Sequence, residues 1–491
     1  MRKTFLSTLL ILFCVFAPAS RAGILFAGER RLNNLVSDLL EVSSISAPSQ
    51  EFSFECSGDG WIFVSGQLAG GGSIAVRLDD TPGDPLIASR GPDAGSNLEA
   101  MRFISKGRHR IRADCEGDSR IARLSVKAIP ELIHCGLGFN SQIKSYGLYD
   151  VDFLRKEILP NVTTLIIPAN LELPKELVED WHRQGKRFVG EVGVDAKAET
   201  AEDHARYWSG FFDRTPLLDG IIIDEFIVNY PLQRRAGALS PERPTRVDRE
   251  REQYEQYTEA LKRMRADTRY KDKLVYTYFG GSGKKLNQEI IGTNLVRTII
   301  NSGYRVALER YLHEMSTEEG SAMALKLFVD GVADWEAKEP GVLKQMVIAF
   351  GLFSMPPGGL NKQPNVDYHV WMDQQMNTVA NNPVFRGLGG IEWWTSSLAD
   401  EETVRFVGRL YRHYAIEGNT NRLTRDPLFL THVLNPDFLY GTRDWTLHAS
   451  EEGAISTNRF ARFGRIEGRF MGLGRPADPE HIGDAFLCLK R

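Results

Sequence analysis

Acidic residues at the ends of short apolar runs are the groups in this chain best suited to chemistry. Asp224 and Glu225 directly follow Ile221 to Ile223, a run too short and too β-branched for a helix. Such a run predicts a buried strand that carries the two carboxylates at its carboxyl end. Because a buried acid without a partner or a task is costly, acids on several strands predict a cavity. Other apolar runs contribute three more glutamates, namely Glu191, Glu309 and Glu392.

Carboxyl groups that face one another can break a glycosidic bond. A protonated acid gives its proton to the leaving oxygen, while an ionised one attacks the anomeric carbon or activates water. Like charges close together raise one pKa and so separate the two roles. Glu191 and nearby aromatic rings are candidates for substrate binding, the rings being Tyr230, Tyr278, Trp393 and Trp394. For Trp393 and Trp394, packing in the core of the fold is the alternative.

Eight strand-like runs alternate with amphipathic helical segments from residue 132 onward. Alternation of this kind predicts parallel strands joined by helices, and eight units match a closed (β/α)8 barrel, whose carboxyl-end face carries the active site. An open doubly wound sheet is the alternative, but its dinucleotide-binding glycine pattern is absent from the first turn. The expected strands are 132–137, 164–168, 187–192, 220–226, 274–278, 305–311, 346–353 and 389–394.

The expected helices fill the intervals between these strands. They are 151–159, 175–184, 201–212, 249–265, 286–290, 321–335, 368–379 and 401–414. The sequence thus predicts an α/β protein with a barrel over residues 131–420.

Short alternating runs broken by Gly, Asp and Pro flank the barrel on both sides. They predict an N-terminal β-sandwich over residues 45–130, preceded by a helical lead-in at 29–42, and a C-terminal β-sandwich over 430–491. Trp61 and Phe63 are candidates for sugar contacts or for the core of the first sandwich. Residues 1–22 have a basic start, an apolar middle and a small-residue end, which is typical of a signal peptide.

Export makes disulfide bonds possible. Cys56 and Cys115 lie in strand-like stretches of the first sandwich, so we expect them to be bridged, whereas Cys135 and Cys488 are expected to be buried thiols.

Two stretches resemble parts of known carbohydrate-active proteins. The run from Asp219 to Phe226, DGIIIDEF, resembles the fourth strand of (β/α)8 glycoside hydrolases, which implies a proton donor at Glu225 or Asp224. In the largest clan of these enzymes the nucleophile ends strand seven, but here that strand lacks a carboxylate. The partner is therefore expected at Glu309 or Glu392, or as the other member of the Asp224–Glu225 pair. Residues 435–458 resemble the opening of jelly-roll modules attached to secreted bacterial carbohydrate-active proteins.

Composition and motifs exclude several other functions. The net charge of −4 comes from dispersed charges, so no nucleic-acid partner is expected, and no segment after residue 22 is apolar enough to remain in a membrane. We find no phosphate-binding loop, serine-hydrolase elbow or zinc spacing, and expect no cofactor and no metal.

Two hypotheses follow from these residues. The first is a secreted or periplasmic glycoside hydrolase acting on a polysaccharide or oligosaccharide. The second is a non-catalytic carbohydrate-binding or surface-assembly protein, in which the acids form structural pairs with Arg187, Arg305, Arg310 or Arg234. Sugar, linkage, stereochemical outcome and oligomeric state are left open.

Overall fold

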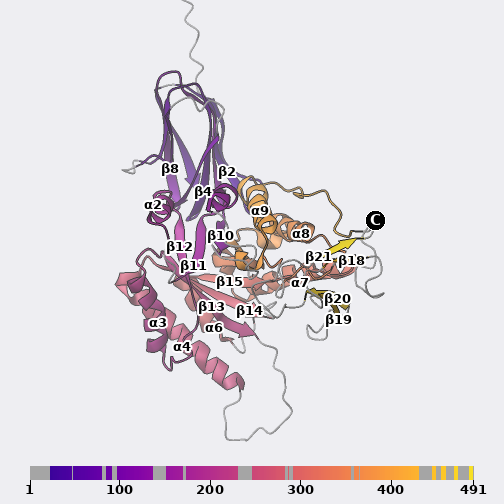
Figure 1. Cartoon of the computed structure of the whole chain (residues 1–491). Coiled ribbons are helices and arrows are strands. Elements are labelled where there is room, and N and C mark those ends of the chain that lie inside the picture. Colours follow the sequence, from indigo (N-terminus) through magenta and orange to yellow (C-terminus); the bar gives the residue numbers. More distant parts are fainter. Residues whose placement is uncertain are drawn as a thin grey trace, which may run out of the picture.

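The chain folds into a β-sandwich, a barrel and short C-terminal strand pairs (Figure 1). The computed structural model describes residues 23–46, 48–79, 84–90, 97–136, 151–169, 173–229, 246–281, 286, 291–354, 359–363 and 365–430, and the strands 445–448, 455–459, 469–473 and 486–489. The expected signal peptide, residues 1–22, and Tyr230 lie outside the described residues.

The N-terminal sandwich consists of two antiparallel sheets with the strand orders β1-β2-β9-β4-β7 and β3-β8-β5-β6. Buried aliphatic side chains from both sheets fill the space between them. The strands are β1 (Gly23–Arg31), β2 (Ser37–Ile45), β3 (Ser49–Cys56), β4 (Gly60–Ala69), β5 (Ser73–Leu78), β6 (Ile87–Arg90), β7 (Asn97–Ile104), β8 (Gly107–Cys115) and β9 (Arg120–Ile129).

The helical lead-in expected at 29–42 is wrong, because β1 and β2 occupy this stretch as an antiparallel pair. Its apolar residues recur at helical spacing, but Asn33 breaks the segment: its side-chain oxygen accepts hydrogen bonds from the backbone N–H groups of Leu35 and Val36. The amide groups of Asn33 and Asn34 donate to carbonyls of the barrel domain. This turn therefore ties the sandwich to the barrel.

The expected bridge between Cys56 and Cys115 is also wrong, because both residues are free thiols. Strands β3 and β8 are antiparallel neighbours in which Cys56 lies opposite Gly107. Cys115 is eight residues farther along β8, about 26 Å away at roughly 3.3 Å per residue, whereas a disulfide needs Cα atoms within about 7 Å. Both cysteines end strands, but at opposite ends of the sheet.

Alkylation should therefore find both thiols without any reductant. Burial raises the pKa of both thiols, so we expect slow labelling of Cys56 and Cys115 in the native protein and full labelling after denaturation. Mass mapping of a non-reduced digest measures this. A peptide pair joined through Cys56 and Cys115 would contradict the structure.

The predicted (β/α)8 fold class is confirmed, since eight parallel strands close in the order β10 to β17. Each strand pairs in parallel with the next, and β17 pairs with β10. The strands are β10 (Glu131–Cys135), β11 (Thr164–Pro168), β12 (Arg187–Val192), β13 (Gly220–Asn229), β14 (Leu274–Gly281), β15 (Arg305–Arg310), β16 (Met346–Gly351) and β17 (Gly390–Trp394).

Helices surround the barrel and bury their apolar faces against it. The helix expected at 286–290 lies almost wholly outside the described residues, and a further helix, Thr293–Asn301, precedes β15. The α-helices are α1 (Val151–Glu157), α2 (Lys175–Arg183), α3 (Ala201–Arg214), α4 (Arg246–Ala266), α6 (Thr293–Asn301), α7 (Glu318–Lys338), α8 (Tyr368–Asn381) and α9 (Glu401–Leu410).

Short helical turns complete the barrel domain. They are η2 (Leu159–Asn161), η3 (Thr268–Tyr270), η4 (Val342–Gln345), η5 (Pro383–Phe385), η6 (Ser396–Leu398) and the π-helical segment η7 (Tyr411–Ile416). No helix among the described residues is both long and apolar enough to cross a bilayer.

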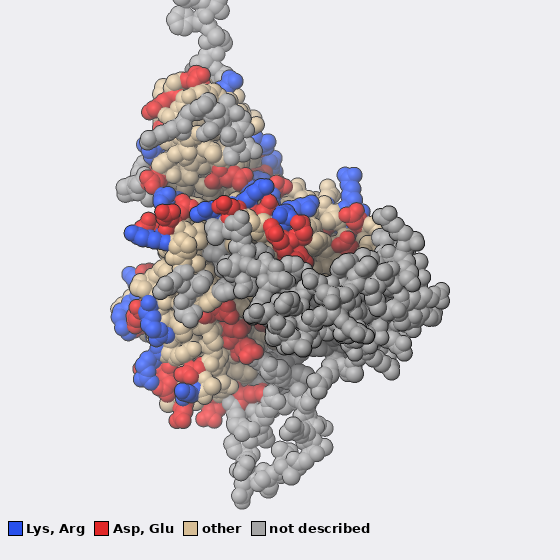
Figure 2. Space-filling view, in the orientation of Figure 1, with Lys and Arg blue, Asp and Glu red and all other residues tan. Residues whose placement is uncertain are grey.

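The sandwich covers the amino-terminal end of the barrel. Strand β9 leads directly into β10, and the guanidinium of Arg187 at the start of β12 lies over the rings of Trp61 and Phe103, 5.0 and 4.3 Å from their centroids. Arg412 forms a two-pronged ion pair with Glu99. Figure 2 shows acidic and basic side chains side by side where the sandwich meets the barrel. Trp61 and Phe63 are thus buried at the domain junction, away from any glycan.

The C-terminal strands form two antiparallel pairs, β18 with β21 and β19 with β20. Antiparallel sheets therefore stand on both sides of the barrel in the sequence. The strands are β18 (Trp445–His448), β19 (Ile455–Arg459), β20 (Arg469–Leu473) and β21 (Phe486–Leu489).

Candidate active site

Alternation along each strand decides which side chains enter the barrel. The interior cluster contains Val189, Ile222 and Ala307, together with the partly buried Trp394. Residues two positions away on the same strands point the same way. The inward side chains near the carboxyl ends therefore include four acids, Glu191 on β12, Asp224 on β13, Glu309 on β15 and Glu392 on β17. We call these four the mouth acids.

The mouth acids are distributed around the barrel wall. Glu191 and Asp224 come from neighbouring strands: Glu191 lies opposite Ile222, two residues before Asp224. Glu309 and Glu392 flank β16, where Ala349 lies opposite both. Because β13 and β17 are four strands apart in a ring of eight, Asp224 and Glu392 approach from opposite walls. Glu191, Asp224 and Glu309 are half-buried, so a ligand at the mouth can reach them.

Glu191 and Asp224 have different affinities for a proton. Burial, and then the charge of Asp224, raises the pKa of Glu191 to about 7. Burial raises the pKa of Asp224 as well. The hydrogen bond from the backbone N–H of Glu225 lowers that pKa, and the charge of Glu225 raises it by a smaller amount. Since the charge of Asp224 acts on Glu191, ionisation of Asp224 helps Glu191 to hold its proton near neutral pH.

Glu392 is fully buried and lies behind the hydroxyl of Tyr278, which donates a hydrogen bond to Glu392 Oε1. Burial raises the pKa of Glu392 to about 8, against the effect of that hydrogen bond, and the charges of Glu309, Asp224 and Glu191 raise it further. The second oxygen, Oε2, is buried and has no hydrogen-bond partner among the described residues. Glu392 thus holds the Tyr278 hydroxyl through one oxygen, while the other is left for a further donor.

Glu309 has a tyrosine and a glycine for neighbours. The hydroxyl of Tyr311 donates a 3.4 Å hydrogen bond to Glu309 Oε1. A side chain on Gly280 of β14 would come within 2.5 Å of Glu309 Oε2, so a larger residue there would displace the carboxylate from its present position.

Glu225 is exposed at the rim rather than among the inward acids. The pairing of β13 with β14 is irregular between Ile223 and Ile227, and within this bulge Glu225 has a φ of +51°. Its backbone N–H donates to Asp224 Oδ1 at 3.0 Å. The bulge turns Asp224 into the mouth and leaves Glu225 outside it.

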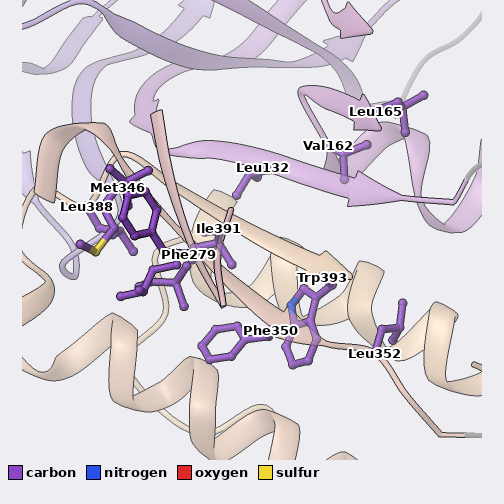
Figure 3. Close-up of a cluster of buried hydrophobic side chains, with 14 of the residues drawn as sticks. Leu132, Val162, Leu165, Phe279, Met346, Phe350, Leu352, Leu388, Ile391 and Trp393 are labelled. Carbon is purple, nitrogen blue, oxygen red and sulfur yellow. The ribbon is translucent and has the colours of Figure 1, made fainter. Parts of the chain in front are cut away.

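The predicted sugar platforms fall on different sides of the strands. Trp393 is fully buried on the outer face, where its ring packs 5.0 Å from that of Phe350, so the sugar-binding prediction for Trp393 is corrected (Figure 3). Trp394 points inward, with its ring edge-on to Tyr278 at 5.1 Å. Tyr278 is fully buried and therefore supports Trp394 and Glu392 instead of stacking on a ring.

Two residues of this site were missed from the sequence. Cys135 points into the barrel from β10 and is close enough to Glu191, Glu392 and Asp224 for their charges to raise its pKa further, after the larger effect of burial. Tyr311 carries no strand-end pattern of its own. Alternation from Ile133 would have placed Cys135 inside, whereas nothing in the sequence indicates the bond of Tyr311 to Glu309.

Comparisons with known proteins give only distant likenesses. No protein-family model and no curated protein matches the chain. Among solved structures it is similar to an endo-β-N-acetylglucosaminidase from Cordyceps militaris, at 13% identity over 57% of this chain and 90% of that chain, with a TM-score of 0.36. A β-glucuronidase 2 from Bacteroides uniformis matches at 10% identity over 83% of this chain and 50% of that chain, with a TM-score of 0.35.

A shorter match is to a family 35 carbohydrate binding module from Clostridium thermocellum, at 15% identity over 22% of this chain and 92% of that module, with a TM-score of 0.16. All of these likenesses are too weak to carry an argument about activity. The fold rests on the strand order of the barrel, and the function has to be argued from the side chains.

Other polar groups lie away from the mouth. Cavities of about 400 and 330 Å³ open on the outside of the barrel, beside α9 and η7, and share Arg409 and Leu423. In the described part of the chain, no three His, Cys, Asp or Glu side chains converge as ligands for a metal ion.

Proposed function

We propose that this protein is a glycoside hydrolase whose reacting groups are Glu191 and Asp224. The observation that carries the proposal is the pairing of two half-buried, inward carboxyl groups on neighbouring strands, one of which keeps its proton near pH 7. Glycosidic cleavage needs one protonated and one ionised carboxyl group at the same bond. The inward indole of Trp394 adds an apolar surface for a sugar ring.

In the proposed reaction Glu191 gives its proton to the glycosidic oxygen as the bond to the anomeric carbon breaks. The Asp224 carboxylate either attacks that carbon or takes a proton from the water that does so. In the first case water releases the sugar from Asp224 and returns a proton to Glu191. This assignment moves the proton donor to Glu191 from Glu225 or Asp224, where the sequence analysis expected it.

The ion pairs of the barrel favour catalysis over a purely structural role for the mouth acids. Arg187 and Arg305 reach Glu131 at the opposite end of the barrel, at 3.3 and 4.0 Å. They are therefore engaged away from the acids that the alternative hypothesis pairs with them. Arg310 donates to the backbone oxygen of Glu309.

Activity on a panel of polysaccharides, followed by NMR of the products, tests the proposal. New reducing ends that depend on Glu191 and Asp224 support it, and the anomer formed first distinguishes direct attack by Asp224 from attack by water. Absence of cleavage across neutral, amino and acidic glycans by the folded protein would refute it.

The pH dependence of kcat/KM gives a further prediction. Glu191 must be protonated to act as the acid, so activity should be present below about pH 7 and fall as the pH rises through that value. Measuring kcat/KM on the best substrate as a function of pH tests this expected fall in activity. If activity increases from pH 6 to pH 9, where Glu191 loses its proton, the proposed donor is wrong.

We also propose export to the cell surface or periplasm, which rests on the signal-like pattern of residues 1–22. Sequencing the amino terminus of the protein from its native cells tests this proposal. An intact Met1 on protein recovered from the cytoplasm would contradict it.

A further inference from the structure

We propose that the mouth binds a glycan with free amino groups, so that the substrate is a polymer or oligomer of protonated 2-amino sugars. The inference rests on the proposed function and names the class of sugar for it. Two observations at the same site lead to it: an excess of carboxyl groups over what the reaction uses, and an unpartnered oxygen among them.

The first observation is the charge of the mouth. Glycosidic cleavage needs two carboxyl groups, and the described strands bring four to the same interior. The electrostatic neighbours of Glu392 are the other three mouth acids, and that of Glu191 is Asp224. Although Glu191 and Glu392 hold their protons more tightly than free carboxyl groups, the charges of Asp224 and Glu309 give the site a negative potential, which attracts cations and repels uronates, sulfates and phosphates.

Two arginines of the barrel strands lie at the end of the barrel opposite the mouth. Arg187 and Arg305 lie at the amino-terminal end with Glu131. Arg310 belongs to the outward set of β15 and is almost fully buried. Arg187 and Arg305 thus add positive charge at the closed end, whereas Arg310 lies next to Glu309 at the carboxyl end, on the outer face of the strand.

The second observation is Glu392 Oε2, which lacks a hydrogen-bond partner although the residue is fully buried. Its carboxyl group faces Asp224 from the opposite wall, and Glu309 lies on the other side of β16. An ammonium group offers three donors and a full positive charge, so it can satisfy a carboxylate oxygen and offset the repulsion at once. A hydroxyl or an acetamide in the same place offers a donor without the charge.

Matched monosaccharides test the inference without assuming a linkage. Glucosamine, galactosamine and mannosamine differ from their N-acetyl and 2-hydroxyl counterparts at one position only. At about pH 6, where the amines are protonated, we expect at least one amine to bind the full-length protein about tenfold or more tighter than both counterparts by calorimetry. The corresponding uronic acids should bind more weakly than the 2-hydroxyl sugars.

Variants test whether the mouth acids cause the preference for amines. Glu309→Gln removes one mouth charge, so it should lower the preference for the amine at least about threefold while binding of the neutral sugar stays the same. Glu51→Gln removes an exposed charge on the sandwich and should leave the preference intact. Equal or tighter binding of the N-acetyl or 2-hydroxyl sugar in all three series, or no binding of any amine, overturns the inference.

The outcomes separate this inference from the proposed function. Hydrolysis of neutral polysaccharides without any preference for amines would refute the amino-sugar inference and support the proposed hydrolase function. Selective binding of amines that depends on Glu309, without cleavage of any glycan, removes the hydrolase and leaves an amino-sugar binding site.

Discussion

Replacing Glu191 by glutamine should lower kcat on the best glycan by about 10²- to 10⁴-fold, the usual contribution of a positioned proton donor. Glutamine keeps the size of the side chain but has no proton to give at this bond. Because burial already favours the neutral form of Glu191, the uncharged substitute should leave the unfolding midpoint almost unchanged. Steady-state rates and thermal unfolding of the same preparation measure both effects.

Asp224→Ala should lower kcat by a similar factor, but an added small anion should restore part of this rate. If Asp224 attacks the anomeric carbon or activates water, a small anion such as azide can occupy the vacated space and restore part of the rate. Azide should not rescue Glu191→Gln on a substrate with a poor leaving group, since the missing element there is the proton.

Glu225→Gln is the matched control, because Glu225 is exposed and next to Asp224. We expect its kcat to stay within about threefold of the wild-type value, as a charge outside the mouth shifts the pKa of Asp224 only modestly. A loss above 10²-fold in Glu225→Gln, together with an active Glu191→Gln, would return the donor to Glu225 and refute our assignment.

The barrel was predictable because its strands carry strong local signals. The triple isoleucine before Asp224 and the similar run before Glu191 allow no other buried element of that length. Helix α6 was not predicted, since Thr293–Asn301 follows a glycine and lacks a capping side chain to mark its start. The antiparallel pair β1 and β2 was taken for a helix because the turn at Asn33 depends on contacts with the barrel.

The direction of adjacent side chains was the part that needed the structure. Glu392 and Trp393 are consecutive, as are Asp224 and Glu225, and alternation allows only one of each pair to enter the barrel. That signal was present in the sequence and could have separated Trp393 from Trp394. The bulge that exposes Glu225 was not predictable, because it appears only as a change of register between β13 and β14.

The closed end of the barrel leads to the prediction with the largest effect on stability. Glu131, only 3% exposed, accepts hydrogen bonds at 2.7 Å from the hydroxyls of Thr164 and Tyr276 and at 3.3 Å from Arg187. Arg305 lies 4.0 Å from its other oxygen. One carboxylate thus joins its own strand, β10, to four other strands of the barrel.

Glu131→Ala should destabilise the protein by about 3 to 5 kcal/mol, because it leaves two largely buried guanidinium groups without their counter-charge. Urea unfolding followed by tryptophan fluorescence measures the loss. Glu51→Gln breaks the exposed pair with Arg110 and should change stability by no more than about 1 kcal/mol.

A double-mutant cycle assigns the loss to the network. Tyr276→Phe removes one donor to Glu131, so its effect should be much smaller in the Glu131→Ala background than in the wild type. The rate per folded molecule should stay near the wild-type value in Glu131→Ala, since this carboxylate lies at the opposite end of the barrel from the mouth acids. If Glu131→Ala unfolds within about 1 kcal/mol of the wild type, or the two substitutions add without coupling, the network does not hold the barrel closed.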